Sequence, residues 1–157
     1  MTDKQTFLLQ RVQPAMTGLI DGSLSTLAPI FAIALHTHEP FDAFIAGVAT
    51  AIGAGISMAF SEGLSDTGEL TGRGNPFARG SITGVGTFVG GIQHTLPFLV
   101  PTYHVALILA IVVVCFELLA LAVLRWRFFE TSFARSFASV TLGGVVIAGV
   151  SAALGTA

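Results

Sequence analysis

Two carboxylates stand deep inside apolar stretches of the sequence. Asp21 lies eight residues beyond Gln13. Glu117 lies eight residues before Arg125, in another stretch. At about 1.5 Å per helical residue, each is roughly 12 Å from the polar end of its stretch, where an unpaired carboxylate costs a few kcal/mol in hydrocarbon. Neither stretch offers a Lys or Arg, which leaves a proton, a cation from solution, or hydrogen bonds from hydroxyl, amide or imidazole groups.

Asp21 belongs to a polar stripe. Thr17, Asp21 and Ser25 are spaced by four residues, so they share one face of a helix. Pro29 lies further along this helix and removes one backbone hydrogen bond, which can free a carbonyl oxygen for a ligand. The alternative interpretation is a protonated Asp21 that packs against a neighbouring helix.

A second set of candidate ligands follows the same spacing. Met58, Glu62 and Asp66 lie four residues apart, and a thioether beside a carboxylate suits a borderline transition metal better than Ca²⁺ or Mg²⁺. A lone Met in an apolar helix is more often core filler. Glu62, Asp66 and Glu69 stand near the polar end, where carboxylates can collect a hydrated divalent ion, although Asp66 and Glu69 are equally explained as solvated or paired with the arginines that follow.

His94 is the remaining candidate. It lies about 22 Å along a helix from Arg79, towards the opposite surface. A proton relay, an exit ligand and a packing hydrogen bond all remain open for it, and Glu117 joins it as a candidate proton relay. In order of depth, the candidates form a path for a cation: Asp66, Glu69, Glu62, Met58, Asp21, Glu117 and His94.

The composition indicates a membrane protein. Of 157 residues, 53% are hydrophobic and 10% charged, and the mean hydropathy is +0.82, whereas a soluble domain carries about 25% charged residues. Seven basic residues and one Cys exclude a basic nucleic-acid surface and a disulfide scaffold. The sequence lacks Gly-x-Ser-Gly and His-Glu-x-x-His patterns, so we expect no enzyme and no permanently bound cofactor.

The elements that must position these side chains are membrane-spanning helices. A span needs about 20 mostly apolar residues, and five stretches qualify: 14–35, 41–63, 79–100, 103–124 and 133–156. We expect an all-α membrane protein with one five-helix transmembrane domain over residues 1–157. Glycine pairs such as Gly80 with Gly84 and Gly86 with Gly90 favour close packing of these helices within the chain.

The basic residues set the expected orientation. They precede the first span, follow the second and follow the fourth, and the other connections have no Lys or Arg. The positive-inside rule then predicts a cytoplasmic N-terminus and an external C-terminus. We expect the membrane to be the inner membrane of a bacterial cell. Because an odd number of spans hinders an internal inverted repeat, symmetry would come from a two-fold homodimer.

Several segments resemble the vacuolar iron transporter family. Residues 18–22 and 56–65 look like parts of its first two helices, and residues 66–74 and 91–97 look like the membrane part of bacterial ferritin-like members. The resemblance implies a homodimer that exports Fe²⁺, and often Mn²⁺, from the cytoplasm in exchange for protons, between the first two helices of both subunits. The family's membrane aspartate falls on Asp21, its methionine on Met58, and its second-helix glutamate on Glu62.

The sequence also departs from this family. Where plant-type members carry a long glutamate-rich insert, only residues 64–78 are present, and Gly63 stands where a tyrosine is usual. The alternative function is therefore a non-transporting membrane scaffold or metal sensor that works with a ferritin-like partner.

Overall fold

The computed structural model describes residues 2–129 and 132–156, and these residues form helices and connections without a strand. The elements in chain order are α1 (Asp3–Phe7), the π-helical η1 (Leu8–Val12), α2 (Gln13–Ser25), α3 (Leu27–Thr37), α4 (Pro40–Ser65), α5 (Pro76–Gln93), the 3₁₀-helical η2 (Leu96–Leu99), α6 (Tyr103–Phe129) and α7 (Phe133–Gly155).

Within the described residues, four helical stretches are long and apolar enough to cross a membrane: Asp3–Thr37, Pro40–Ser65, Tyr103–Phe129 and Phe133–Gly155. Many of their large apolar side chains are exposed, including Phe60, Ile108 and Leu142. An apolar outer surface of this extent fits a lipid environment. The chain is accordingly a multi-pass, all-helical membrane protein.

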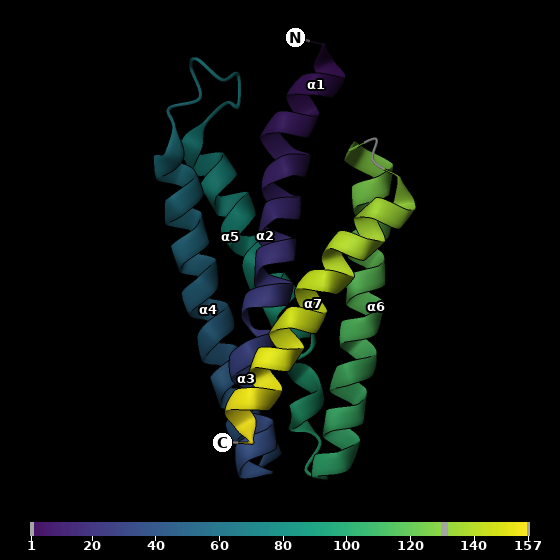
Figure 1. Cartoon of the computed structure of the whole chain (residues 1–157). Helices are drawn as coiled ribbons and strands as arrows, with labels where there is room; N and C mark the ends of the chain where they lie inside the picture. Colours follow the sequence, from purple (N-terminus) through teal and green to yellow (C-terminus); the bar gives the residue numbers. More distant parts are fainter. Residues whose placement is uncertain (1, 130–131, 157) are drawn as a thin grey trace.

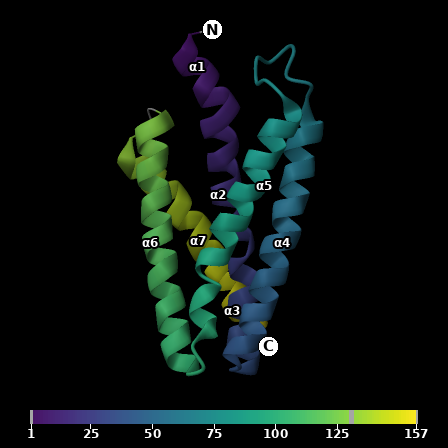
Figure 2. The same ribbon diagram turned by 180° about the vertical axis from the view of Figure 1, so that it is seen from behind.

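The helices form an elongated bundle with α5 between α2 and α4 (Figures 1 and 2). α7 crosses the bundle and packs on α3 and α6. The N-terminus, the 66–75 connection, the end of α6 and the start of α7 share one end of the bundle, and the C-terminus lies at the opposite end (Figure 1). All the regions that carry Lys or Arg therefore share one end, as the sequence pattern predicts.

Glycines allow the close approach of α5 to both neighbours. A Cβ at Gly84 would lie 2.6 Å from the carbonyl oxygen of Gly55 in α4. A Cβ at Gly90 would lie 2.5 Å from the carbonyl oxygen of Leu19 in α2. These contacts confirm the prediction that the glycine pairs pack helices within the chain.

Two of the predicted spans are interrupted. The first breaks at Thr26, between α2 and α3, because Pro29 has no N–H for the Ser25 carbonyl one turn earlier. The predicted 79–100 helix ends at Gln93 and continues after His94 and Thr95 as η2, which contains Pro97. α5 is also shorter and more polar than the four long stretches, since its buried side chains include Arg79, Thr83 and Thr87.

Candidate functional site

Two buried ionisable groups, His94 and Glu117, form a pair in the middle of the bundle. His94 Nδ1 lies 2.9 Å from Glu117 Oε2, and the two side chains are 0% and 6% exposed. His94 follows the last residue of α5, whereas Glu117 lies on α6, twelve residues before its end. The sequence left several kinds of partner possible for Glu117. In the fold, one of its partners is the imidazole of His94.

Two hydroxyl groups complete this cluster. Ser23 Oγ lies 2.7 Å from Glu117 Oε1 and 2.7 Å from the Leu19 carbonyl oxygen. On the other side of the pair, Thr26 Oγ1 lies 2.7 Å from His94 Nε2 and donates to the Gly22 carbonyl oxygen at 2.7 Å. We call Ser23, Thr26, His94 and Glu117 the buried polar network; it joins α2, α5 and α6 at the two helix breaks.

The depths counted from the sequence placed His94 further out than Glu117. That count started from flanking arginines and took Arg125 as the end of the span. α6 instead continues to Phe129, which puts Glu117 about 18 Å from the helix end. The 2.9 Å contact between the two side chains shows that Glu117 and His94 lie at one level.

Asp21 is not part of this network. Ser23, which faces Glu117, is two residues further along α2 and therefore about 200° around the helix. Asp21 is half-buried between exposed Thr17 and Ser25. The polar stripe thus lies on an outward face of the protomer. The similar depth that the sequence predicts for Asp21 and Glu117 is not accompanied by a hydrogen bond between them among the described residues, where Glu117 bonds to Ser23 and His94.

Met58 is half-buried on α4, and α5 lies between α4 and the helix that carries Asp21 (Figures 1 and 2). Among the described residues, no group of three or more His, Cys, Asp or Glu side chains is arranged to hold a metal ion.

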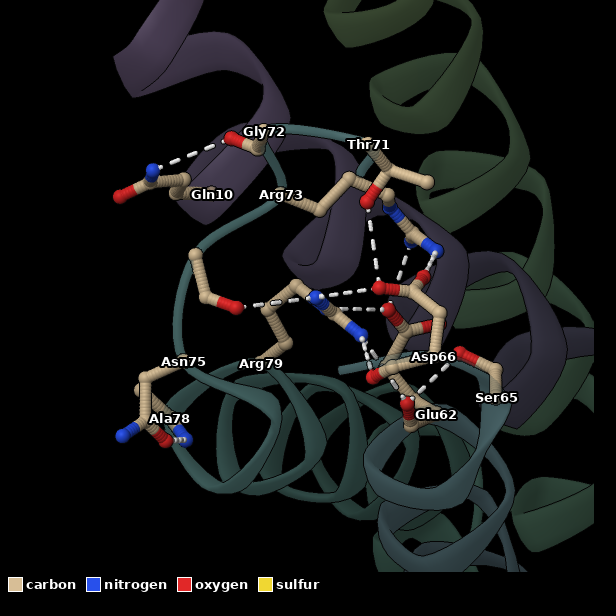
Figure 3. A network of polar contacts seen from close by, with 11 residues as sticks. Gln10, Glu62, Ser65, Asp66, Thr71, Gly72, Arg73, Asn75, Ala78 and Arg79 are labelled. Atoms are coloured by element: carbon tan, nitrogen blue, oxygen red, sulfur yellow. Dashed lines mark hydrogen bonds and ion pairs between the residues drawn. The ribbon is translucent and has the colours of Figure 1, made fainter. Parts of the chain in front are cut away.

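At the basic end of the bundle, Arg79 organises the carboxylates of α4 (Figure 3). Its Nε donates to Glu62 Oε1 at 2.9 Å, and its Nη1 donates to Asp66 Oδ1 at 3.4 Å and to the Gly74 carbonyl oxygen at 3.2 Å. Its Nη2 donates to the carbonyl oxygens of Asp66 at 3.2 Å and Glu62 at 3.5 Å. These bonds use all five guanidinium hydrogens, and the side chain is 1% exposed.

Arg73 binds the same two carboxylates from the connection itself. Its Nη2 lies 2.6 Å from Glu62 Oε1, and its Nη1 lies 3.1 Å from Asp66 Oδ2. The 66–75 connection is also tied to η1, because Gln10 Nε2 donates to the Gly72 carbonyl oxygen at 3.2 Å (Figure 3). We call Glu62, Asp66, Arg73 and Arg79 the arginine clamp.

The pKa of Asp66 reflects the clamp. Partial desolvation raises this pKa, but hydrogen bonds from Thr71, from the Gly68 backbone and from Arg73, with the charge of Arg79, outweigh it and hold the pKa below its ordinary value. A carboxyl group with a lowered pKa stabilises the fold above the unfolded value of about 3.9 and loses this contribution as the pH falls through the folded value. The Asp66 carboxylate is therefore ionised at neutral pH.

The predicted entry carboxylates are consequently not equivalent. Glu62 and Asp66 are engaged by arginines, whereas Glu69 is exposed in the connection. The sequence interpretation had considered arginine pairing for Asp66 and Glu69 but not for Glu62. The available signal was the four-residue spacing of Arg79, Thr83 and Thr87, which places Arg79 on the buried face of α5.

Comparison with family models, with curated protein sequences and with solved structures finds no match to this chain.

Proposed function

We propose that two copies of the chain form a transporter that exports a divalent transition-metal ion, Fe²⁺ or Mn²⁺, from the cytoplasm in exchange for protons. In this proposal the chain crosses the membrane five times, with α5 and η2 as the third crossing. The N-terminus is cytoplasmic because the Lys and Arg residues gather at that end.

The placement of Asp21 carries the proposal. This carboxylate lies within an apolar helical stretch, on a face that points away from the rest of the protomer. Such a group costs several kcal/mol in lipid unless something covers or neutralises it. A second copy related by a two-fold axis along this face would bring two Asp21 side chains together.

The same arrangement provides the proton coupling. Two neighbouring carboxylates do not both remain ionised without a cation. Arrival of a metal would displace their protons, and its departure would return them. The Met58 thioethers of both copies would add soft ligands that favour Fe²⁺ or Mn²⁺ over Ca²⁺ and Mg²⁺.

Metal capture at the cytoplasmic end begins at Glu69, which is exposed, and proceeds to Glu62 and Asp66. Since both inner carboxylates bind Arg73 and Arg79, an incoming ion must compete with two guanidinium groups. Entry is therefore a competition between the metal ion and the guanidinium groups for the same oxygen atoms. In this proposal these carboxylates take over metal capture from the long insert of the family that the sequence resembles.

The arginine clamp also favours a second candidate. If the guanidinium groups hold Glu62 and Asp66 permanently, no metal passes, and the chain acts as a non-transporting scaffold or metal sensor beside a ferritin-like partner. The clamp then serves only to fix the 66–75 connection as a docking surface.

Flux measurements separate the two functions. The purified protein is reconstituted into proteoliposomes, and entry of Fe²⁺, Mn²⁺ and Mg²⁺ is followed with and without an imposed pH gradient. A transporter moves Fe²⁺ or Mn²⁺ at a rate that depends on the gradient and discriminates against Mg²⁺. Rates equal to those of empty liposomes would refute transport.

A further inference from the structure

We propose that the buried polar network is a proton-binding site within one protomer, able to take up one proton more than the neutral His94–Glu117 pair holds. The site is separate from Asp21 and Met58, and it requires neither a metal nor a second copy of the chain. Its ligand is the proton alone.

The geometry of the network makes a continuous chain of hydrogen bonds. Starting at the Leu19 carbonyl oxygen, it passes through Ser23, Glu117, His94 and Thr26, and it ends at the Gly22 carbonyl oxygen. Among the described residues, this series of hydrogen bonds contains five close polar pairs, each with a distance between 2.7 and 2.9 Å. Every pair needs one hydrogen between its two heavy atoms.

The neutral pair does not supply enough hydrogens. A hydroxyl group has one hydrogen, and a neutral imidazole and a protonated carboxylic acid, or their ion pair, have two together. Ser23, Thr26 and the neutral pair therefore hold four hydrogens for five close polar pairs. At least one close pair of oxygen or nitrogen atoms is then left with no hydrogen between its two atoms.

One further proton completes the series of hydrogen bonds. Glu117 then donates to Ser23, whose hydroxyl donates to the Leu19 carbonyl oxygen. His94 donates from Nδ1 to the other oxygen of Glu117 and from Nε2 to Thr26, whose hydroxyl donates to the Gly22 carbonyl oxygen. Each hydroxyl acts once as donor and once as acceptor, as its chemistry allows.

Within residues 2–129 and 132–156, no other ionisable side chain is placed to cancel the charge of this extra proton. On α2, Asp21 lies on the opposite face, and on α6, Cys115 is exposed. The remaining ionisable residues of the surrounding helices lie near helix ends: His36 on α3, Asp42 and Glu62 on α4, Arg79 on α5, Tyr103, His104, Arg125 and Arg127 on α6, and Arg135 on α7. Burial opposes the added charge, so the completed hydrogen bonds must offset that cost.

The position of the network gives proton uptake a structural effect. Thr26 lies at the break between α2 and α3, and His94 lies at the end of α5. In membrane transporters, discontinuous helices commonly form the sites for substrates and coupling ions. A proton that completes the series of hydrogen bonds therefore strengthens the link between these two helix breaks and α6.

The test observes the network directly, without metal. The full chain, labelled with ¹⁵N at its four His residues and with ¹³C at Glu carboxyl groups, is titrated in detergent from about pH 8 to pH 5, the range in which imidazole normally exchanges protons. The signals of His94 and Glu117 are assigned with His94→Gln and Glu117→Gln. We expect one shared transition, after which both imidazole nitrogens and the carboxyl group carry hydrogen.

Ser23→Ala provides the sharper measurement, because it keeps both ionisable groups and removes the acceptor of the Glu117 proton. Proton affinity should fall about tenfold, the equivalent of one lost hydrogen bond. Ser151→Ala is the matched control: Ser151 is also buried and donates to the carbonyl four residues earlier, Ile147, at 2.8 Å. A pair that holds the same number of protons throughout the titration, or a transition that Ser23→Ala and Ser151→Ala leave equally unchanged, would overturn the proposal. Neither result bears on metal flux, so the proposed function is judged separately.

Discussion

At the scale of single residues, the two membrane carboxylates are stabilised in different ways. Glu117 is buried and bonded to His94 and Ser23 within one protomer. Asp21 lies half-buried on an outward face. An internal carboxylate with fixed partners suits proton storage, whereas an outward one suits an interface between copies of the chain. This division of roles is why we place the metal at Asp21 and the additional proton at Glu117.

Met58 tests the ligand set at the proposed metal site. Met58→Leu conserves side-chain volume and removes only the sulfur, so the free energy of unfolding should change by less than about 1.5 kcal/mol. Transport of Fe²⁺ should weaken, because Leu offers no donor atom. Initial rates in proteoliposomes at several Fe²⁺ concentrations check this. Rates that match the unmodified protein would show that Met58 only packs.

Arg79 tests the clamp. Arg79→Met leaves Glu62 and Asp66 with one guanidinium between them and should destabilise the fold by about 3 kcal/mol, the usual cost of breaking a buried ion pair. Arg127→Met, at an exposed position on α6, should change stability by no more than about 0.5 kcal/mol. Unfolding in detergent measures both. Equal stability of the two variants would contradict the central role of Arg79 in the clamp.

At the scale of elements, sequence periodicity and length predicted some helices better than others. The expected 41–63, 103–124 and 133–156 spans correspond to α4, α6 and α7, because a long apolar run is decisive when most side chains face lipid. The interruptions at Thr26 and His94 were not predicted, although Pro29 and Pro97 were visible in the sequence. A proline can kink or end a helix, and tertiary packing decides which.

The candidate site was predicted in its residues but not in its contacts. Hydropathy alone identified Asp21, Glu117 and His94 as exceptional polar groups. Their partners depend on helix rotation, which spacing within one helix does not determine. His94 and Glu117 meet because the break after α5 and the following η2 lie against α6. Asp21 does not join them because Gly18 and Gly22 face α5 and Ser23 faces Glu117, which leaves Asp21 on another side of α2.

Gly22 tests the packing of α2 on α5. A Cβ at Gly22 would collide with the carbonyl oxygen of Thr87, which belongs to helix backbone and cannot move aside independently. Gly22→Ala should therefore cost about 1 to 3 kcal/mol of stability. At Gly53 in α4 a Cβ meets nothing within 4 Å, so Gly53→Ala should be neutral or stabilise by up to about 1 kcal/mol. Thermal unfolding measures the stability of both variants. If Gly22→Ala is as stable as Gly53→Ala, the described α2–α5 contact is wrong.

At the scale of the whole molecule, the bundle is asymmetric in charge and apolar around its sides. The Lys and Arg residues gather at the end that contains the 66–75 connection, and the described C-terminal residues lie at the other (Figure 1). This polarity predicts the orientation in the membrane.

The orientation is checked with a reporter fused beyond position 157. Ala157 itself lies outside the described residues, but α7 ends near it at Gly155. We expect the reporter to be external, and a second reporter at the N-terminus to be cytoplasmic. A cytoplasmic signal from the C-terminal fusion would rule out either the five crossings or their direction.

The central claim is that Asp21 couples metal movement to protons across a homodimer. The most direct measurement is simultaneous Fe²⁺ and proton flux in proteoliposomes that contain either the unmodified protein or Asp21→Asn, with the dimer verified by cross-linking in both. Asn conserves size and hydrogen bonding but cannot exchange a proton, so we expect opposed Fe²⁺ and proton movement for the unmodified dimer and loss of both for the variant. An Asp21→Asn dimer that still exchanges Fe²⁺ for protons at the unmodified rate would contradict the claim.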